Sequence, residues 1–145
     1  MSVRFRAVLT ACLAVPMGAV LLTACAGNAV TDPAELEGTW VLESYAEGVE
    51  QTDVDPAVNS EITFDNGQVT GSGGVNTFSG TYEADDGRLQ FGPLASTLMA
   101  GEPAAMEQES GFFSALEATE SFEVFEGKLV LSGKNNDTAA ILVPK

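Results

Sequence analysis

The chain has 145 residues, of which 21 are Asp or Glu, six are Lys or Arg and none is His, so its formal net charge is −15. This balance excludes a nucleic-acid-binding protein, since phosphate binding needs clustered Lys and Arg. It also argues against electrostatic adhesion to anionic lipid. Without His, the chain lacks the commonest general base and metal ligand, and the sequence predicts no cofactor, metal site or nucleic-acid partner.

Residues 1–24 have the pattern of a signal peptide. Arg4 and Arg6 form a positive start, and residues 7–22 are uncharged and mostly apolar. This apolar run is shorter than the roughly 20 residues of a membrane-spanning helix. The segment ends with Leu22, Thr23, Ala24 and Cys25. A branched apolar residue, two small residues and a Cys resemble the bacterial lipobox.

The lipobox predicts that Cys25 carries a diacylglycerol and becomes the first residue after cleavage. Each buried lipid CH₂ stabilises the anchoring by about 0.8 kcal/mol. The chain would then sit in the bacterial envelope, on the outer side of the cytoplasmic membrane or on the outer membrane, with residues 25–36 as lipidated Cys and tether. The alternatives are an ordinary secretory signal followed by a chance Cys, or a retained anchor helix. Because the other Cys is Cys12, the exported part would contain no disulfide.

Residues 37–145 alternate short apolar runs with turn signals, which is typical of an antiparallel β protein. Asn66-Gly67 between the runs 61–64 and 68–71 predicts a hairpin, since both turn residues accept positive φ. Further strands are expected at 38–45, 78–82, 89–91, 122–125, 129–131 and 139–143.

One segment, 103–118, has no turn signal and predicts a helix. Pro103 suits the first helical turn. An apolar stripe that includes Phe112 is interrupted by Glu109, and Gly111 weakens the helix by about 1 kcal/mol relative to Ala. The predicted fold class is therefore α+β, predominantly β, with one curled antiparallel sheet packed on this helix.

Four motifs in order carry a family resemblance. They are Leu-Glu-Gly-Thr-Trp-Val-Leu at 36–42, Gly-Ser-Gly-Gly-Val-Asn-Thr-Phe-Ser-Gly-Thr-Tyr at 71–82, Leu-Ala-Ser-Thr-Leu-Met-Ala-Gly at 94–101 and Leu-Val-Leu at 129–131. Together they resemble the META domain (HslJ-like) family over residues 36–145. The resemblance implies an exported or envelope location and a link to stress tolerance. It implies no agreed enzymatic activity and supplies no catalytic residues.

The chain departs from this family at two positions. Val75 and Gly101 stand where the family often has Cys, and the resemblance implies that those Cys form a disulfide between the Asn-containing loop and the start of the helix. If so, Val75 and Gly101 lie close enough for a bridge, with Cα atoms about 4.4–6.8 Å apart.

The family-like stretches also provide a candidate binding or structural loop, which comprises Asn76, Phe78, Gly80, Thr97 and Met99. Asn76 has two interpretations: a ligand contact on an exposed loop, or a side chain that bonds neighbouring backbone and holds the loop. The second is favoured because Asn often does this in turns. Thr97 is expected to bond backbone, Gly80 to permit a bulge or a tight approach, and Met99 and Trp40 to fill the core.

These features predict a non-enzymatic envelope or stress-associated accessory protein that acts through a protein partner, whose surface would be basic. The alternative is an inhibitor of an envelope or extracellular hydrolase, a lysozyme or protease, in which the loop 71–76 plugs the active site. A carboxylate enzyme using Asp85 and Asp86 ranks last, because nothing singles out a catalytic pair.

Overall fold

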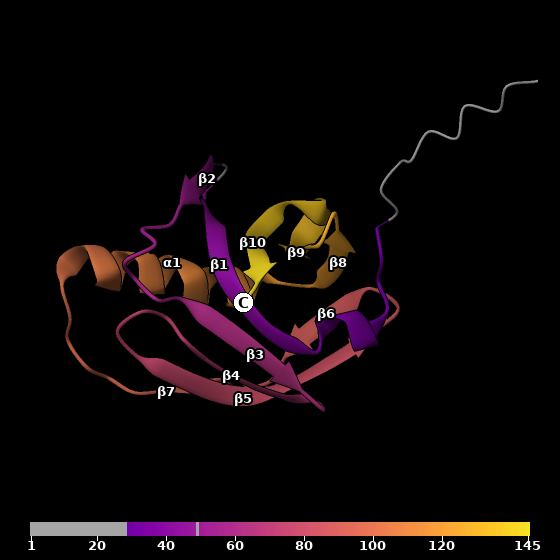
Figure 1. Ribbon diagram of the computed structural model, residues 1–145, viewed down its shortest axis with the longest axis horizontal. Coiled ribbons are helices and arrows are strands. Elements are labelled where there is room, and N and C mark those ends of the chain that lie inside the picture. Colours follow the sequence, from indigo (N-terminus) through magenta and orange to yellow (C-terminus); the bar gives the residue numbers. More distant parts are fainter. Residues whose placement is uncertain (1–28, 49) are drawn as a thin grey trace, which may run out of the picture.

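The computed structural model describes residues 29–48 and 50–145 of the chain (Figure 1). The predicted signal peptide and the lipobox at residues 22–25 lie outside the described residues. Within the described ranges, no helix combines the length and the apolar character needed to cross a membrane.

The described residues are mostly strands. The elements in chain order are η1 (Pro33–Leu36), β1 (Gly38–Glu47), β2 (Glu50–Asp53), β3 (Glu61–Asp65), β4 (Gln68–Ser72), β5 (Thr77–Asp85), β6 (Arg88–Phe91), β7 (Ala95–Ser96), α1 (Pro103–Ala118), β8 (Ser121–Phe125), β9 (Lys128–Ser132), η2 (Lys134–Asn136) and β10 (Thr138–Pro144). The hairpin predicted around Asn66-Gly67 is present as β3 and β4, with positive φ at both turn residues. The predicted helix occupies 103–118.

Eight strands form a closed antiparallel barrel. Their order is β10-β9-β8-β6-β5-β4-β3-β1, and β1 pairs back with β10. β2 pairs only with β1, and β7 only with β5, so both lie outside the ring.

The expected curled sheet packed on a helix is therefore wrong, because the sheet closes on itself. Closure depends on β1, which pairs with β3 through residues 38–41 and with β10 through residues that include Trp40↔Pro144. A bulge between Leu42 and Ser44 shifts the register within the β1–β10 ladder, and bulges bend and twist a strand. This pairing joins the two ends of the domain, and no local pattern indicates it.

The ring is weakest between β6 and β8, which share the single pair Arg88↔Ser121. Val30 fills part of this seam. Its N–H donates to the carbonyl of Val124 at 2.8 Å, and the Val124 N–H donates back at 2.7 Å. Leu36 is fully buried. Val30 and Leu36, which belong to the segment expected to be tether, are therefore part of the folded domain.

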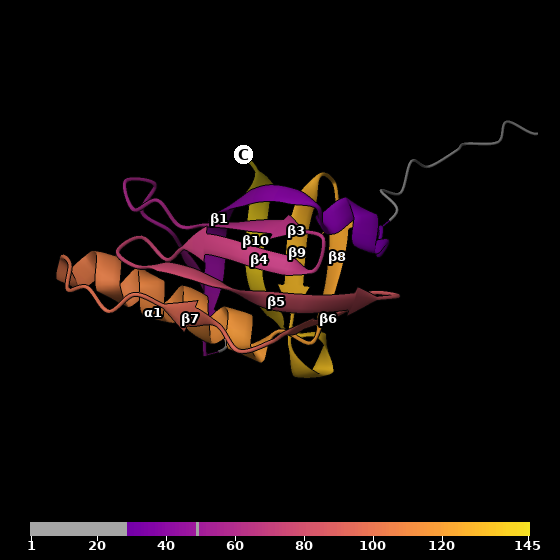
Figure 2. The ribbon, with the colours of Figure 1, turned by 90° about the horizontal axis from the view of Figure 1, so that it is seen from below.

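The helix α1 lies across the barrel end where β1 ends and β10 begins (Figures 1 and 2). Phe112 and Leu116 point from it into the core, with 0% and 1% exposure. At Gly111 the helix packs directly against Tyr45 of β1, because a Cβ there would overlap the ring of Tyr45. The helix therefore closes one end of the barrel.

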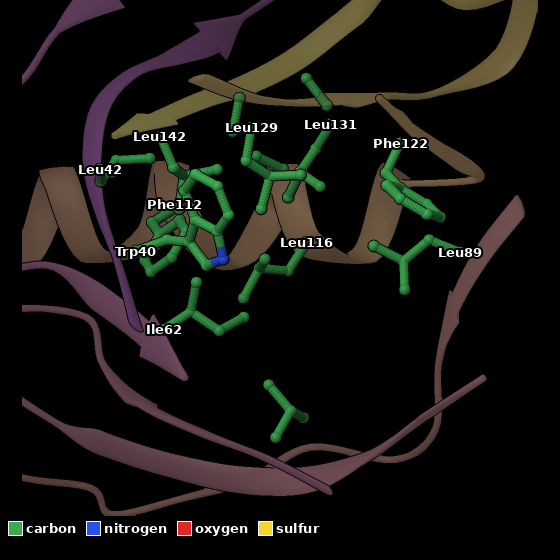
Figure 3. Packing of buried hydrophobic residues seen from close by; sticks show 14 of the residues in the cluster. Trp40, Leu42, Ile62, Leu89, Phe112, Leu116, Phe122, Leu129, Leu131 and Leu142 are labelled. Carbon is green, nitrogen blue, oxygen red and sulfur yellow. The ribbon is translucent and has the colours of Figure 1, made fainter. Parts of the chain in front are cut away.

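Alternate residues of the strands fill the interior, as the period of two requires. In β3, for example, Ile62 and Phe64 face inward and are 0% and 1% exposed. Figure 3 shows Trp40, Ile62 and Leu116 in one cluster with the leucines of β9 and β10. The Trp40 indole N–H donates to the Leu36 carbonyl at 2.8 Å, so the expected core position of Trp40 is confirmed.

Candidate functional site

The candidate residues meet beside the N-terminal half of α1. The loop between β4 and β5 lies on one side, and residues 97–101, which we call the tip loop, lie between β7 and α1. Glu109 of α1 joins them and is only 4% exposed.

Hydrogen-bond donors surround the Glu109 carboxylate. Its Oε2 accepts from the backbone N–H groups of Val75 at 3.0 Å and Asn76 at 2.6 Å. Its Oε1 accepts from the Asn76 side-chain amide at 2.6 Å. Both salt bridges found among the described residues lie elsewhere, at Lys128 and Lys145. Amide donors rather than a cation therefore compensate the burial of this carboxylate.

Asn76 extends the network to the tip loop. Its Nδ2 donates to the Met99 carbonyl at 3.2 Å, while its Oδ1 accepts from the Met99 N–H at 2.7 Å and the Thr97 hydroxyl at 2.8 Å. The side chain is 4% exposed. Asn76 thus holds the tip loop and α1 to the β4–β5 loop, and its amide oxygen and nitrogen are both engaged within the protein.

Phe78 and Gly80 have structural roles: Phe78 packs in the core, and Gly80 lies where two segments approach closely. Phe78 is 3% exposed and packs edge-on against the rings of Phe112 and Phe113, with centroids 6.1 and 5.4 Å away. A Cβ at Gly80 would lie 2.8 Å from the Pro93 carbonyl oxygen. Gly80 therefore permits the close approach of the segment before β7.

Met99 was expected to fill the core, and this is wrong, because its side chain is 55% exposed. Both its backbone polar groups bond to Asn76, which leaves the side chain on the outer surface of the loop. The neighbouring Leu98 is 97% exposed. The tip loop therefore presents two large apolar side chains to solvent.

A hollow of 460 Å³ lies between the tip loop and α1. Met106 and Phe113 contribute apolar surface from the helix, Leu98 and Met99 contribute it from the loop, and Asn76 also lines the hollow. The hollow and the two exposed side chains form one surface, the tip face, which consists of the tip loop and the α1 residues Met106, Ser110 and Phe113.

The structure also brings Val75 and Gly101 together. A Cβ built on Gly101 would lie 3.3 Å from the Cβ of Val75. The two positions at which the family often has Cys are thus neighbours, one in the β4–β5 loop and one in the tip loop.

Sequence reasoning missed the roles of two α1 residues. Gln108 is buried, accepts from the Asp55 N–H at 2.8 Å and donates to the Ser60 hydroxyl at 2.9 Å. Nothing in its local sequence indicated this. The role of Glu109 did leave a signal, namely an acid within an apolar stripe. Gly73 is required beside it, since a Cβ there would lie 2.7 Å from Oε2.

The other acidic residues form no comparable site. Asp85 and Asp86 are exposed at the β5–β6 turn. Across residues 29–48 and 50–145, no group of three or more His, Cys, Asp or Glu side chains is arranged to hold a metal ion.

Two buried phenols have shifted acidity. Burial raises the pKa of Tyr82 above its ordinary value of 10.0, and so does its 2.9 Å hydrogen bond to Glu37. Burial, together with the charges of Glu47 and Glu107, also raises the pKa of Tyr45. Both groups stay neutral in the folded protein well above physiological pH.

These features define a small antiparallel β-barrel protein with one helix across its end and an amide–carboxylate network beneath an exposed loop. The sequence model of the META domain matches residues 34–144, and the chain belongs to that family. No curated protein matches the chain significantly.

Three solved structures share the fold. A Burkholderia xenovorans protein solved by NMR is 25% identical, with a TM-score of 0.64 over 79% of this chain and 89% of its own. A DUF4847 family protein from Bacteroides vulgatus is 18% identical, with a TM-score of 0.54 over 76% and 94%. A further NMR structure is 22% identical, with a TM-score of 0.53 over 73% and 88%.

Proposed function

We propose that this META domain protein is an HslJ-like lipoprotein, exported and anchored in the bacterial envelope through Cys25, and that it serves there as a non-enzymatic, stress-associated accessory protein. The lipobox at residues 22–25 supports the anchor. A protein partner, bound through the tip face, would carry its function.

The observation that carries this proposal is that the polar side chains of the site are buried and hydrogen-bonded within the protein. The polar atoms of Asn76 and Glu109 bond to one another and to backbone, and both side chains are 4% exposed. A catalytic carboxylate or amide has to reach substrate, whereas these hold a loop that exposes Leu98 and Met99. A rigid loop with apolar side chains suits binding, because little conformational entropy remains to be lost.

The position of the tip face suits an anchored protein. The indigo segment that contains η1 lies at one end of the molecule's longest axis, and the start of α1 with the tip loop lies at the other (Figures 1 and 2). Four residues lie between Cys25 and Val30, and the five Cα-to-Cα steps that join them span at most about 18 Å. An anchor at Cys25 would therefore keep the Val30 seam near the membrane and leave the tip face directed away from it.

The test is made in the native envelope with the full chain. Metabolic labelling with a fatty-acid probe should mark the protein, and Cys25→Ala should remove the label. Chemical cross-linking should yield a stoichiometric protein partner that the Cys25→Ala control does not retain. An unlabelled wild-type chain would contradict the anchor, and the absence of any enriched partner would contradict the accessory role.

A hydrolase inhibitor is the second candidate, and the exposed tip loop favours it. The sequence pointed to the loop 71–76 as the plug, but this loop is unsuitable, because Gly73 and Asn76 are buried against Glu109. The tip loop exposes Leu98 and is held at Met99 by Asn76, so it replaces the loop 71–76 as the segment that would enter an active site. Micromolar protein should then inhibit lysozyme or a protease, and Leu98→Asp should relieve the inhibition. Full activity of the enzymes with wild-type protein would reject this candidate.

A further inference from the structure

We infer that the tip face binds a basic segment of a partner protein, which inserts an apolar side chain into the hollow between the tip loop and α1. The inference rests on the proposed accessory function and names the chemistry of its partner. Three properties of the tip face lead to it, namely its shape, its charge and its rigidity.

The shape provides room for an anchor. The hollow has a volume of 460 Å³, and Met99, Met106 and Phe113 contribute to its apolar wall. Binding energy at protein interfaces concentrates in a few apolar or aromatic side chains that fill such pockets. Methionine side chains adapt their shape to an inserted group. Leu98, at 97% exposure, would pack against the side of the same segment.

The charge selects a basic partner. From residue 89 to residue 127 the chain contains seven acidic residues and no Lys or Arg. Two of these acids, Glu102 and Glu107, are exposed. Glu102 directly follows the tip loop as the N-cap of α1, and Glu107 is the fifth residue of the helix, next to Met106 of the tip face. Lys128 and Lys145 lie elsewhere and pair with Glu43 and Glu61 at 2.6 and 2.7 Å. A Lys- or Arg-bearing segment is therefore attracted, while an acidic protein or anionic lipid is repelled.

The rigidity lowers the cost of binding. The Met99 backbone bonds to Asn76 through both its N–H and its carbonyl, and Asn76 bonds to Glu109. The tip loop is thus held in place before a partner arrives, which reduces the entropy lost on association.

Site-specific photocross-linking of the full chain in its own envelope tests this inference. A photoreactive amino acid replaces Ala100 in the tip loop, and in a control chain it replaces Gln68, which is exposed on β4 at the other end of the barrel. Cross-linked peptides are identified by mass spectrometry. Two further variants carry the Ala100 probe, one with Leu98→Asp and one with Glu102→Lys and Glu107→Lys. The matched charge control carries Glu35→Lys and Glu83→Lys, which are exposed away from the tip face.

The expected result is a protein adduct from position 100 and none from position 68, with Lys or Arg beside an apolar residue in the cross-linked peptide. Leu98→Asp should weaken capture by about 30-fold, the loss typical of one central interface residue. The Glu102→Lys, Glu107→Lys variant should lose capture, and the Glu35→Lys, Glu83→Lys variant should keep it. All changed side chains are exposed, and unchanged thermal melting would show that folding is intact.

Three results would overturn the inference: an acidic cross-linked peptide, a lipid adduct, or capture that Leu98→Asp leaves unchanged. Protein adducts from position 68 but not from position 100 would reject the tip face and leave the accessory function standing. The absence of protein adducts from both positions and from chemical cross-linking would reject the accessory function as well.

Discussion

A disulfide engineered between Val75 and Gly101 should form readily and stabilise the domain. A Cβ at position 101 lies 3.3 Å from the Val75 Cβ, close to the range of about 3.5–4.5 Å found in disulfides. Gly101 has no positive φ, so a side chain there meets no backbone strain. Val75→Cys with Gly101→Cys would tie the tip loop to the β4–β5 loop, beside the existing Asn76 network.

The size of the effect follows from the loop that the bond closes, which is 101 − 75 = 26 residues long. In the chain-entropy model, closing such a loop in the unfolded state stabilises the fold by about 3.5 kcal/mol. A domain of about 110 residues has an unfolding entropy near 230 cal/mol/K, so the melting temperature should rise by about 15 °C.

The assay uses the chain from residue 26 onward, because it lacks Cys12 and Cys25 and contains no thiol before mutation. Thiol titration should find no free thiol in the oxidised double variant and two after reduction. Thermal melting of the oxidised and reduced forms gives the effect of the bond alone, and each single variant serves as a control. Two free thiols under oxidising conditions would refute the proximity of the positions. A closed disulfide without a rise in melting temperature would refute the loop-entropy argument.

Three other outcomes are expected. Glu109→Gln should lower the free energy of unfolding in urea by about 2–3 kcal/mol, because the new side-chain NH₂ group would face the N–H donors that the carboxylate now accepts from. The exposed Glu107→Gln should change it by no more than about 0.5 kcal/mol. Equal effects of the two substitutions would contradict the network. Gly111→Ala should destabilise the fold by about 1–3 kcal/mol despite a better helix propensity, since its Cβ would overlap the Tyr45 ring, and a stabilised variant would contradict that packing. Folding raises the pKa of Tyr45 and Tyr82 above 10.0, so the phenols of the unfolded chain lose their protons at lower pH than those of the folded protein. The free energy of unfolding should therefore fall as pH rises above about 10. Tyrosinate absorbance follows the titration, and a free energy of unfolding that does not change with pH in this range would contradict the shift.

The candidate site was only partly accessible to sequence reasoning. Asn76 stood out because it lies in a family-like loop between small residues, and backbone bonding is a common role for such an Asn. Its bonds to Glu109 cross 33 residues of sequence, so no local pattern could indicate them. Met99 was misplaced for the same reason. Because Met is apolar, the sequence predicts a core position, but the bonds of the Met99 backbone to Asn76 turn the side chain outward.

In the fold, too, the features set by local sequence were predictable and those set by long-range contacts were not. The sequence by itself determined the hairpin at Asn66-Gly67, the helix at 103–118 and the inward face of Trp40, because turn chemistry, helix propensity and side-chain periodicity act over a few residues. Only the tertiary structure decided that the sheet closes into a barrel, since β1 and β10 pair across about the whole domain. It also decided that a buried carboxylate, which local sequence shows only as a break in an apolar stripe, holds the exposed tip loop. Long-range hydrogen bonds create both features, and their partners are set by the packing of the whole chain.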